Sequence, residues 1–191
     1  MTTRLQHVQA GWAALAVRPR PLEVAAAVAG DDLIAAPDVV RDRGFDLPAP
    51  PAAVWPWIVQ LGKGRSGWYL PQRVEALVPP NRRALRRIDP TLQQLQVGDV
   101  IDDWGGPDAT FEVVTLEPPA TLVHRSTRGA MRVSWAIQLH PEAPAGTRIH
   151  LRLRLAGVRH RRLAELGGGL LDLLTIAGLA AGLRERLPTA R

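Results

Sequence analysis

The chain has 191 residues, of which 46% are hydrophobic, and its 24 basic and 18 acidic residues give a net charge of +6. This length and composition suffice for one buried core, and no shift in composition divides the chain in two. The absence of cysteine excludes disulfides and thiolate metal sites, and it fits a reducing compartment, so we expect a cytoplasmic protein.

Residues 1–37 are predicted to be a helical or irregular N-terminal leader, because they are rich in alanine and interrupted by proline. The short apolar run at residues 10–17 contains a tryptophan and is followed by no small-residue cleavage site, so it does not predict a signal peptide. Residues 38–191 are expected to form the domain. Its first element is a strand over residues 39–47, which the prolines that follow bring to an end.

A helix is expected next, because Val54, Trp57, Ile58 and Leu61 fall on one face at helical spacing. Pro56 is compatible with this helix only in the first turn, where its missing N–H costs little.

A second short helix is predicted over residues 68–78, after a glycine-rich break at residues 62–67. Asn81 and Asp89 are candidate N-caps of two further single turns. The break has the glycine spacing of a dinucleotide-binding loop, but a phosphate cradle needs a strand before the glycines, and here a helix precedes them. We therefore interpret it as a turn, which Arg65 stabilises by donating to carbonyls or a carboxylate; contact with a ligand carboxylate is the alternative.

The second half of the chain changes to a period of two, which predicts an antiparallel meander. In the last two strands, apolar residues alternate with polar ones such as Arg148, His150, Arg152 and Arg154, so one face is expected to be apolar and the other wet and basic. The predicted strands cover residues 100–104, 110–116, 122–127, 131–139 and 147–155.

A long helix over about residues 170–187 is the element that can cover the apolar sheet face. Its apolar residues extend almost all round, which indicates burial on more than one side, while Asp172 argues against a membrane span. The predicted fold class is α+β: a curved antiparallel sheet of about six to seven strands wrapped on a long C-terminal helix, with two short helices closing one end. Such a helix-grip arrangement leaves room for a cavity between helix and sheet.

Several separated motifs then occur in an order that resembles the bacterial SRPBCC proteins of the START/Bet v1-like, polyketide cyclase and lipid-transport superfamily. The motifs are Gly30-Asp31-Asp32-Leu33-Ile34, residues 49–51, 54–62 and 64–69, Gln94 with Val97-Gly98-Asp99, Glu117-Pro118-Pro119, and residues 146–148 with Arg152 and Arg154. The resemblance implies a helix-grip fold with an internal cavity for a hydrophobic ligand, in a subgroup of unassigned function. The chain departs from its relatives after Tyr69, where they often place a small polar residue, an aromatic residue and Asp, so no role of that Asp is carried over.

The residues that we expect to bind the ligand combine the aromatic segment near residue 68 with inward positions on the strands and the C-terminal helix. Trp68 and Tyr69 either fill the core or line the cavity mouth, and Trp135 points inward as core or cavity wall. The full set is Trp57, Arg65, Trp68, Tyr69, Trp104, Phe111, His124, Trp135 and Leu174.

The sequence thus favours binding or carriage of a hydrophobic small molecule, a lipid or a polyketide-like compound. A cyclase or dehydratase acting in the same cavity is the alternative; it would use His124 with Ser126 and fails if His124, Asp102 and Arg125 all face solvent. No catalytic residue is assigned.

A second alternative is a peripheral membrane module, which would use the basic clusters at residues 82–87 and 159–162 together with the apolar C-terminal helix. These clusters contain no interleaved aromatic residues, so no nucleic-acid partner is expected. The histidine spacing predicts no metal site, and no cofactor is expected.

Overall fold

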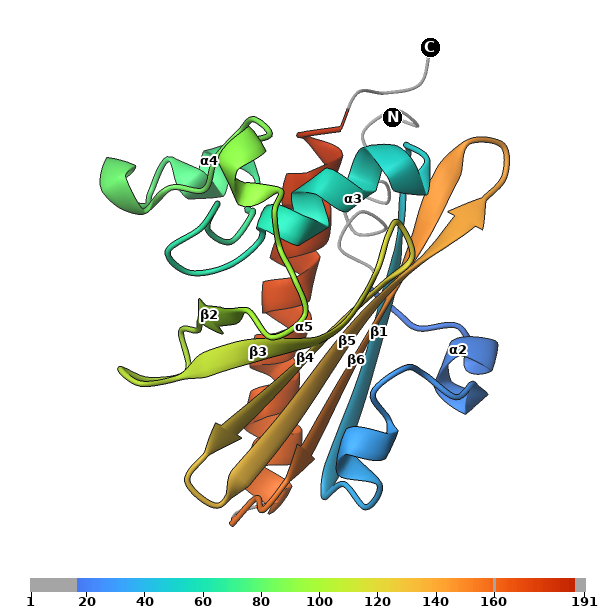
Figure 1. The fold of residues 1–191 in the computed structure, drawn as a ribbon, viewed down its shortest axis with the longest axis vertical. Helices are drawn as coiled ribbons and strands as arrows, with labels where there is room; N and C mark the ends of the chain where they lie inside the picture. Colours follow the sequence, from blue (N-terminus) through green and yellow to red (C-terminus); the bar gives the residue numbers. More distant parts are fainter. Residues whose placement is uncertain (1–16, 160, 188–191) are drawn as a thin grey trace, which may run out of the picture.

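Six antiparallel strands form one sheet in the order β1-β6-β5-β4-β3-β2, and a long helix, α5, crosses one of its faces (Figure 1). The computed structural model describes residues 17–159 and 161–187, with the backbone alone for 161–167. The helix-grip fold predicted from the sequence is therefore confirmed. The elements are α2 (Pro21–Ala25), η1 (Asp32–Ile34), β1 (Val39–Leu47), α3 (Pro51–Gln60), α4 (Gln72–Glu75), η2 (Pro80–Arg82), η3 (Pro90–Leu92), β2 (Val100–Asp102), β3 (Thr110–Glu117), β4 (Thr121–Arg128), β5 (Met131–Glu142), β6 (Gly146–Ala156) and α5 (Arg161–Arg184).

The strand predictions are confirmed, most closely for β1, while β2 ends two residues earlier than expected. Cross-strand pairing sets apolar residues against one another: Phe45 pairs with Ile149 and Leu122 with Ile137. Because side chains alternate along a strand, this register gathers the apolar residues on the inner face, toward α5.

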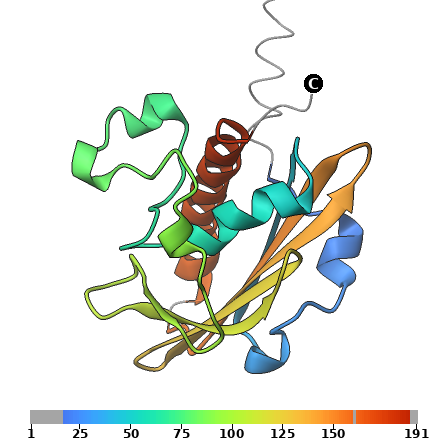
Figure 2. The same ribbon diagram turned by 45° about the horizontal axis from the view of Figure 1, so that its top comes forward.

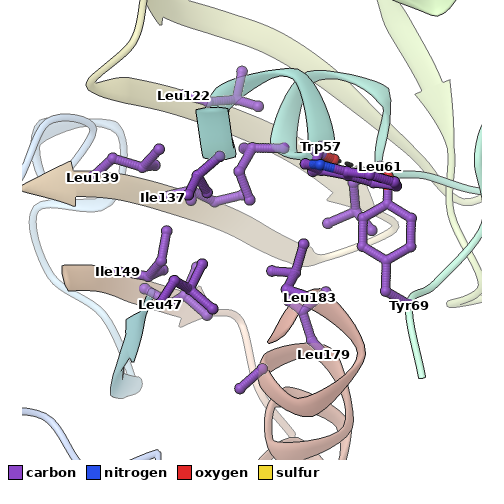
Figure 3. Close-up of a cluster of buried hydrophobic side chains, with 14 of the residues drawn as sticks. Leu47, Trp57, Leu61, Tyr69, Leu122, Ile137, Leu139, Ile149, Leu179 and Leu183 are labelled. Atoms are coloured by element: carbon purple, nitrogen blue, oxygen red, sulfur yellow. Dashed lines mark hydrogen bonds between the residues drawn. The ribbon is translucent and has the colours of Figure 1, made fainter. Parts of the chain in front are cut away.

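The main core lies where the C-terminal half of α5 and the helix α3 meet the inner face of the sheet. Figure 3 shows Leu179 and Leu183 of α5 facing Leu47 and Ile149, with Trp57 nearby. All five side chains are buried. The core is thus concentrated at one end of α5.

Two local predictions between β1 and β2 are wrong. The helix α3 begins at Pro51, so Pro56 lies inside it and not in its first turn. Pro51 takes the N-terminal position at which a missing N–H costs little. The predicted helix over residues 68–78 shrinks to α4, because Pro71 disfavours helical geometry at Leu70 and leaves Trp68 and Tyr69 in extended chain.

Of the two predicted caps, Asp89 is confirmed, since its side chain accepts a hydrogen bond from the Thr91 amide at the start of η3. Asn81 lies inside η2 and not at its N-cap, which is Pro79. The loop 62–67 is closed by a bridge between Gly62 and Gly67.

The outer face of the sheet is covered along β6, which corrects the expectation of a wet basic surface there. Residues 17–37, including α2, pack on the side of the sheet opposite α5 (Figure 2). Arg148, His150 and Arg152 are buried there and are paired with acids. The first sixteen residues of the predicted leader lie outside the described part of the chain.

Among the side chains of α5 that the structure describes, the buried ones all lie from Ile176 onward, whereas the sequence predicted a helix buried on more than one side. Ile176, Leu179 and Leu183 are buried, but Leu170 and Leu174 are about 60% exposed. Between residues 168 and 176, α5 contacts β1 through Arg43, and a cavity separates it from the strands farther along the sheet.

Candidate functional site

A cavity of about 580 Å³ lies between the first half of α5 and the inner face of strands β3 to β6. A volume of this size is typical of pockets that bind small organic ligands. The lining combines aromatic and aliphatic side chains with a few polar groups: Trp68, Asp103, Trp104, Phe111, Arg128, Met131, Val133, Trp135, Leu153, Leu155, Gly168, Leu171, Asp172, Thr175 and Ile176.

Four aromatic residues form one wall of the cavity. Trp68 stacks on Trp135 with ring centroids 6.1 Å apart and meets Trp104 edge-on at 6.0 Å, while Phe111 lies 6.0 Å from Trp135. The indole Nε1 of Trp68 donates to the carbonyl of Thr175 at 3.3 Å, which ties this wall to α5. The wall therefore offers broad ring surfaces with fixed orientation.

The charged groups at the cavity are paired. Arg128 donates from Nη2 to Asp103 at 2.6 Å and lies over the Phe111 ring, 5.1 Å from its centroid. Asp172 on α5 forms an ion pair with Arg43 on β1 at 2.8 Å. Burial raises the pKa of Asp172, and the positive charge of Arg43 opposes this effect. Each charged residue of the lining therefore has an oppositely charged partner.

His124 lines a smaller chamber of about 30 Å³, next to the cavity behind the aromatic wall. Its ring stacks on Trp135 at 5.6 Å and is 5% exposed. Burial and the nearby charge of Arg65 lower the pKa of His124 to about 4. A hydrogen bond with the backbone of Trp135 raises this pKa but does not outweigh them. The imidazole is therefore neutral at pH 7.

Five of the residues predicted from the sequence meet at these two spaces. Trp68, Trp104, Phe111 and Trp135 line the large cavity, and His124 lines the chamber.

The other four predicted residues lie elsewhere. Trp57 and Tyr69 belong to the core, where the Tyr69 hydroxyl donates to the Trp57 carbonyl at 2.9 Å. Arg65 donates to two backbone carbonyls, at 3.1 and 2.7 Å, and so holds its turn. Leu174 is 61% exposed and lines neither space, while Leu171, one turn earlier, lines the cavity.

Sequence reasoning missed the polar rim of the cavity. Asp172 could have been predicted as a functional residue, since it is a lone charge within an apolar stretch of the helix. Asp103 and Arg128 had none, because they are 25 residues apart and meet only where the segment after β2 approaches the end of β4.

Of the three residues on which the catalytic alternative depends, only His124 is buried. Asp102 lines the same chamber as His124 but is largely exposed, and Arg125 forms an exposed ion pair with Glu112. Among the described residues, no three of His, Cys, Asp and Glu gather as metal ligands would.

The basic clusters are partly engaged in contacts of their own. Arg83 donates to backbone carbonyls, and Arg86 pairs with Glu75 and Glu185. Of the second cluster, the side chains of His160, Arg161 and Arg162 lie outside the described part. Within that part, no helix combines the length and apolarity needed to cross a bilayer.

Comparison with known proteins yields structural similarity alone. No family model matches the chain, and no curated protein does. Similar solved structures include CalU16 from Micromonospora echinospora, with 19% identity over 77% of this chain and 83% of that one and a TM-score of 0.45. Protein MLL2253 from Mesorhizobium loti has 18% identity over 78% of this chain and 98% of that one, with a TM-score of 0.47.

A third similar structure is PFC0360w, an HSP90 activator from Plasmodium falciparum, with 12% identity over 60% of this chain and 71% of that one and a TM-score of 0.40. At these values the likeness indicates nothing about ligand or reaction. The helix-grip assignment follows from the strand order and from the packing of α5 in the chain itself.

Proposed function

We propose that this protein binds a hydrophobic small molecule in the cavity between the sheet and the first half of α5. The observation that carries the proposal is the cavity itself, which has a volume of about 580 Å³ and an aromatic wall built from Trp68, Trp104, Phe111 and Trp135. Burial of apolar surface contributes about 2.5 kcal/mol per 100 Å² removed from water, so a flat apolar molecule would gain most of its affinity here without charged contacts.

The exposed leucines of α5 support the same proposal. Leu171 is 68% exposed although it lines the cavity, so a bound molecule would cover apolar surface that now meets water. The ion pair of Arg43 with Asp172 joins this part of α5 to β1 beside the cavity.

The proposal is tested by titrating the protein with 1-methylpyrene and following energy transfer from tryptophan to pyrene. We expect saturable binding with one site per chain. Leu171→Ala should weaken this binding about three- to tenfold, since it removes apolar lining, whereas Leu174→Ala should leave it unchanged. The two leucines lie on the same helix with similar exposure, so they form a matched pair. Equal effects of both substitutions would contradict binding in this cavity.

A peripheral membrane role is the second candidate, and one observation favours it. Leu170, Leu171 and Leu174 are exposed together on the half of α5 that borders the cavity, which is where an apolar ligand would enter from a bilayer. Sedimentation with vesicles of phosphatidylcholine and phosphatidylglycerol tests this role. Binding that weakens in Leu170→Ser and as salt rises is expected, and absence of any binding at low salt would remove the candidate.

The cyclase or dehydratase alternative depends on His124, since Asp102 and Arg125 do not line the large cavity and are exposed, although Asp102 borders the chamber of His124. A neutral imidazole can accept a proton from a bound molecule. Because a single inward base supports less chemistry than a set of oriented groups, binding remains the function that the geometry supports best.

A further inference from the structure

A second hollow lies on the face of the sheet opposite α5, where η1 borders the strands β3, β4 and β5 (Figure 2). We call it the outer hollow. Its volume of about 390 Å³ falls within the range of small-molecule sites. Its charged lining residues are Glu112, Arg125 and Arg132, none of which lines the cavity under α5. The outer hollow is therefore a separate candidate site.

The wall of the outer hollow is held in place by contacts beneath it. Arg154 of β6 donates from Nε to the carbonyl of Ile34 at 3.1 Å and from Nη1 to Asp31 at 3.0 Å. The turn before η1 packs closely on β4, since a Cβ atom placed on Gly30 would lie 2.5 Å from Val123. Because the wall is already folded, a ligand would not have to order it on binding.

Two arginines are neighbours on the floor of the outer hollow. Arg125 of β4 lies opposite Ser134 of β5, and Thr127 lies opposite Arg132, so the two arginines are diagonal neighbours on one face. Both are exposed. Long side chains are within reach of each other across such a diagonal, and two positive charges at this separation repel.

Only one of these two charges is balanced. Arg125 donates from Nε and Nη2 to the two carboxylate oxygens of Glu112, each at 2.9 Å, and this pair does not use its Nη1. Arg132 has no hydrogen bond and no ion pair with any residue that the structure describes. Asp31, the acid at the wall, is already engaged by two arginines of β6. The outer hollow therefore keeps a positive charge that an anion would neutralise.

We propose that the outer hollow binds a small phosphate monoester. The guanidinium fork of Arg132 would donate two hydrogen bonds to phosphate oxygens. Nη1 of Arg125 and the hydroxyl of Thr127 would donate to the remaining oxygens, and the side chain of Leu33 would contact the organic part. A phosphate monoester has three terminal oxygens and nearly two negative charges at neutral pH. It matches these donors better than a carboxylate, which has two oxygens and one charge.

The test titrates the protein with phenyl phosphate at constant ionic strength and about pH 7.5, above the second pKa of the phosphate. The arginine Nε–H and backbone amide resonances are followed by NMR. We expect those of Leu33, Thr127 and Arg132 to shift with one dissociation constant of about 1 mM, and phenol to leave them unchanged. Shifts that avoid these residues would overturn the site.

Arg132→Gln and Arg87→Gln form a matched pair of variants. Each removes one exposed arginine and lowers the net charge by the same amount, and Arg87 lies outside the outer hollow. Both should fold, because surface substitutions have small effects on stability. We expect Arg132→Gln to weaken phenyl phosphate binding about five- to tenfold and Arg87→Gln to leave it unchanged. Equal weakening would mean attraction to the net charge and would contradict a site.

A lipid headgroup offers the same phosphate chemistry, and sedimentation with phosphatidic acid vesicles distinguishes this source. Vesicle binding that requires Arg132, without any binding of phenyl phosphate, would overturn the proposal of a small ester. The inference is independent of the proposed function, since Arg132 does not line the cavity. If 1-methylpyrene binds and phenyl phosphate does not, the inference is wrong and the proposed function stands.

Discussion

At the scale of single residues, His124 shows how burial changes the chemistry of a side chain. An imidazole in water is half protonated near pH 6.5, but between two aromatic rings the charged form loses its hydration. The ring is therefore neutral and has a lone pair to offer. The sequence could place His124 on a strand face with Ser126, but the degree of burial depends on Phe111 and Trp135, which come from other strands.

The first prediction concerns the pH dependence of stability. The pKa of His124 in the folded chain, about 4, lies below its ordinary value of 6.5. The unfolded chain therefore binds the proton first, and the free energy of unfolding decreases as the pH falls from about 6.5 toward 4. We expect His124 to account for a loss of about 2 kcal/mol between pH 7 and pH 5.

Urea unfolding at pH 7 and pH 5 measures this loss. His124→Gln, which does not titrate, should show a loss smaller by about 2 kcal/mol than the wild type. The same loss in both proteins would mean that His124 titrates normally in the folded chain.

At the scale of elements, α5 has two halves with different tasks. Its second half packs closely on the chain before α4: a Cβ atom placed on Gly182 would lie 2.6 Å from the backbone of Tyr69. Its first half borders the cavity, and a Cβ atom on Gly168 would meet nothing closer than 3.6 Å. Glycine is required for close approach in one half and is only a weak helix former in the other.

The second prediction uses these two glycines as a matched pair within one helix. Gly182→Ala should lower the free energy of unfolding by about 1 to 3 kcal/mol, because backbone atoms must move to make room. Gly168→Ala should raise it by about 0.5 to 1 kcal/mol through helix propensity alone. Thermal and urea unfolding measure both changes. Similar effects at the two sites would contradict the division of α5.

The segment 17–37 is a second element with a distinct role, since it is held on the outer face of the sheet by buried charges. Arg152 donates to Asp42 at 2.8 Å, to Asp31 at 2.9 Å, and to three backbone carbonyls near α2. Burial alone would raise the pKa of Asp42, but hydrogen bonds from His150 and Arg152 outweigh it and lower that pKa.

The third prediction compares this network with a surface pair. Arg152→Met should destabilise the fold by about 3 to 5 kcal/mol, because it leaves the buried Asp42 with His150 alone and takes the guanidinium donor from three backbone carbonyls near α2. Arg125→Met removes an arginine that pairs with Glu112 at the surface and should cost no more than about 1 kcal/mol. Urea unfolding at pH 7 measures both. A small cost at Arg152 would show that the segment 17–37 is held by other contacts.

At the scale of the whole molecule, the sequence predicted the sheet better than the elements around it. Alternating apolar residues fixed the strands, because one face of the sheet must be buried. The exposure of the outer face along β6 was predicted wrongly. Alternating arginines on a strand indicate a solvated face, but here they form ion pairs with acidic residues 23, 31 and 42, which are distant in the sequence.

The cavity was predicted from the sequence only in its aromatic part. Phe111 and Trp135 follow from strand alternation, whereas Trp104 lies beyond the end of β2. An empty space leaves no pattern in a sequence. Leu171 and Leu174 are the same residue type about one turn apart on α5, and the packed structure places only Leu171 in the lining of the cavity. The ligand-binding hypothesis therefore depends on how α5 packs in the structure as well as on the sequence motifs.

The central claim is that an apolar molecule binds between α5 and the inner face of the sheet, and a crystal structure of the protein grown with 1-methylpyrene tests it most directly. We expect the pyrene ring in the cavity, with Trp135 on one side and Leu171 on the other. Pyrene bound only outside this cavity at a saturating concentration, with the cavity unchanged, would contradict the claim.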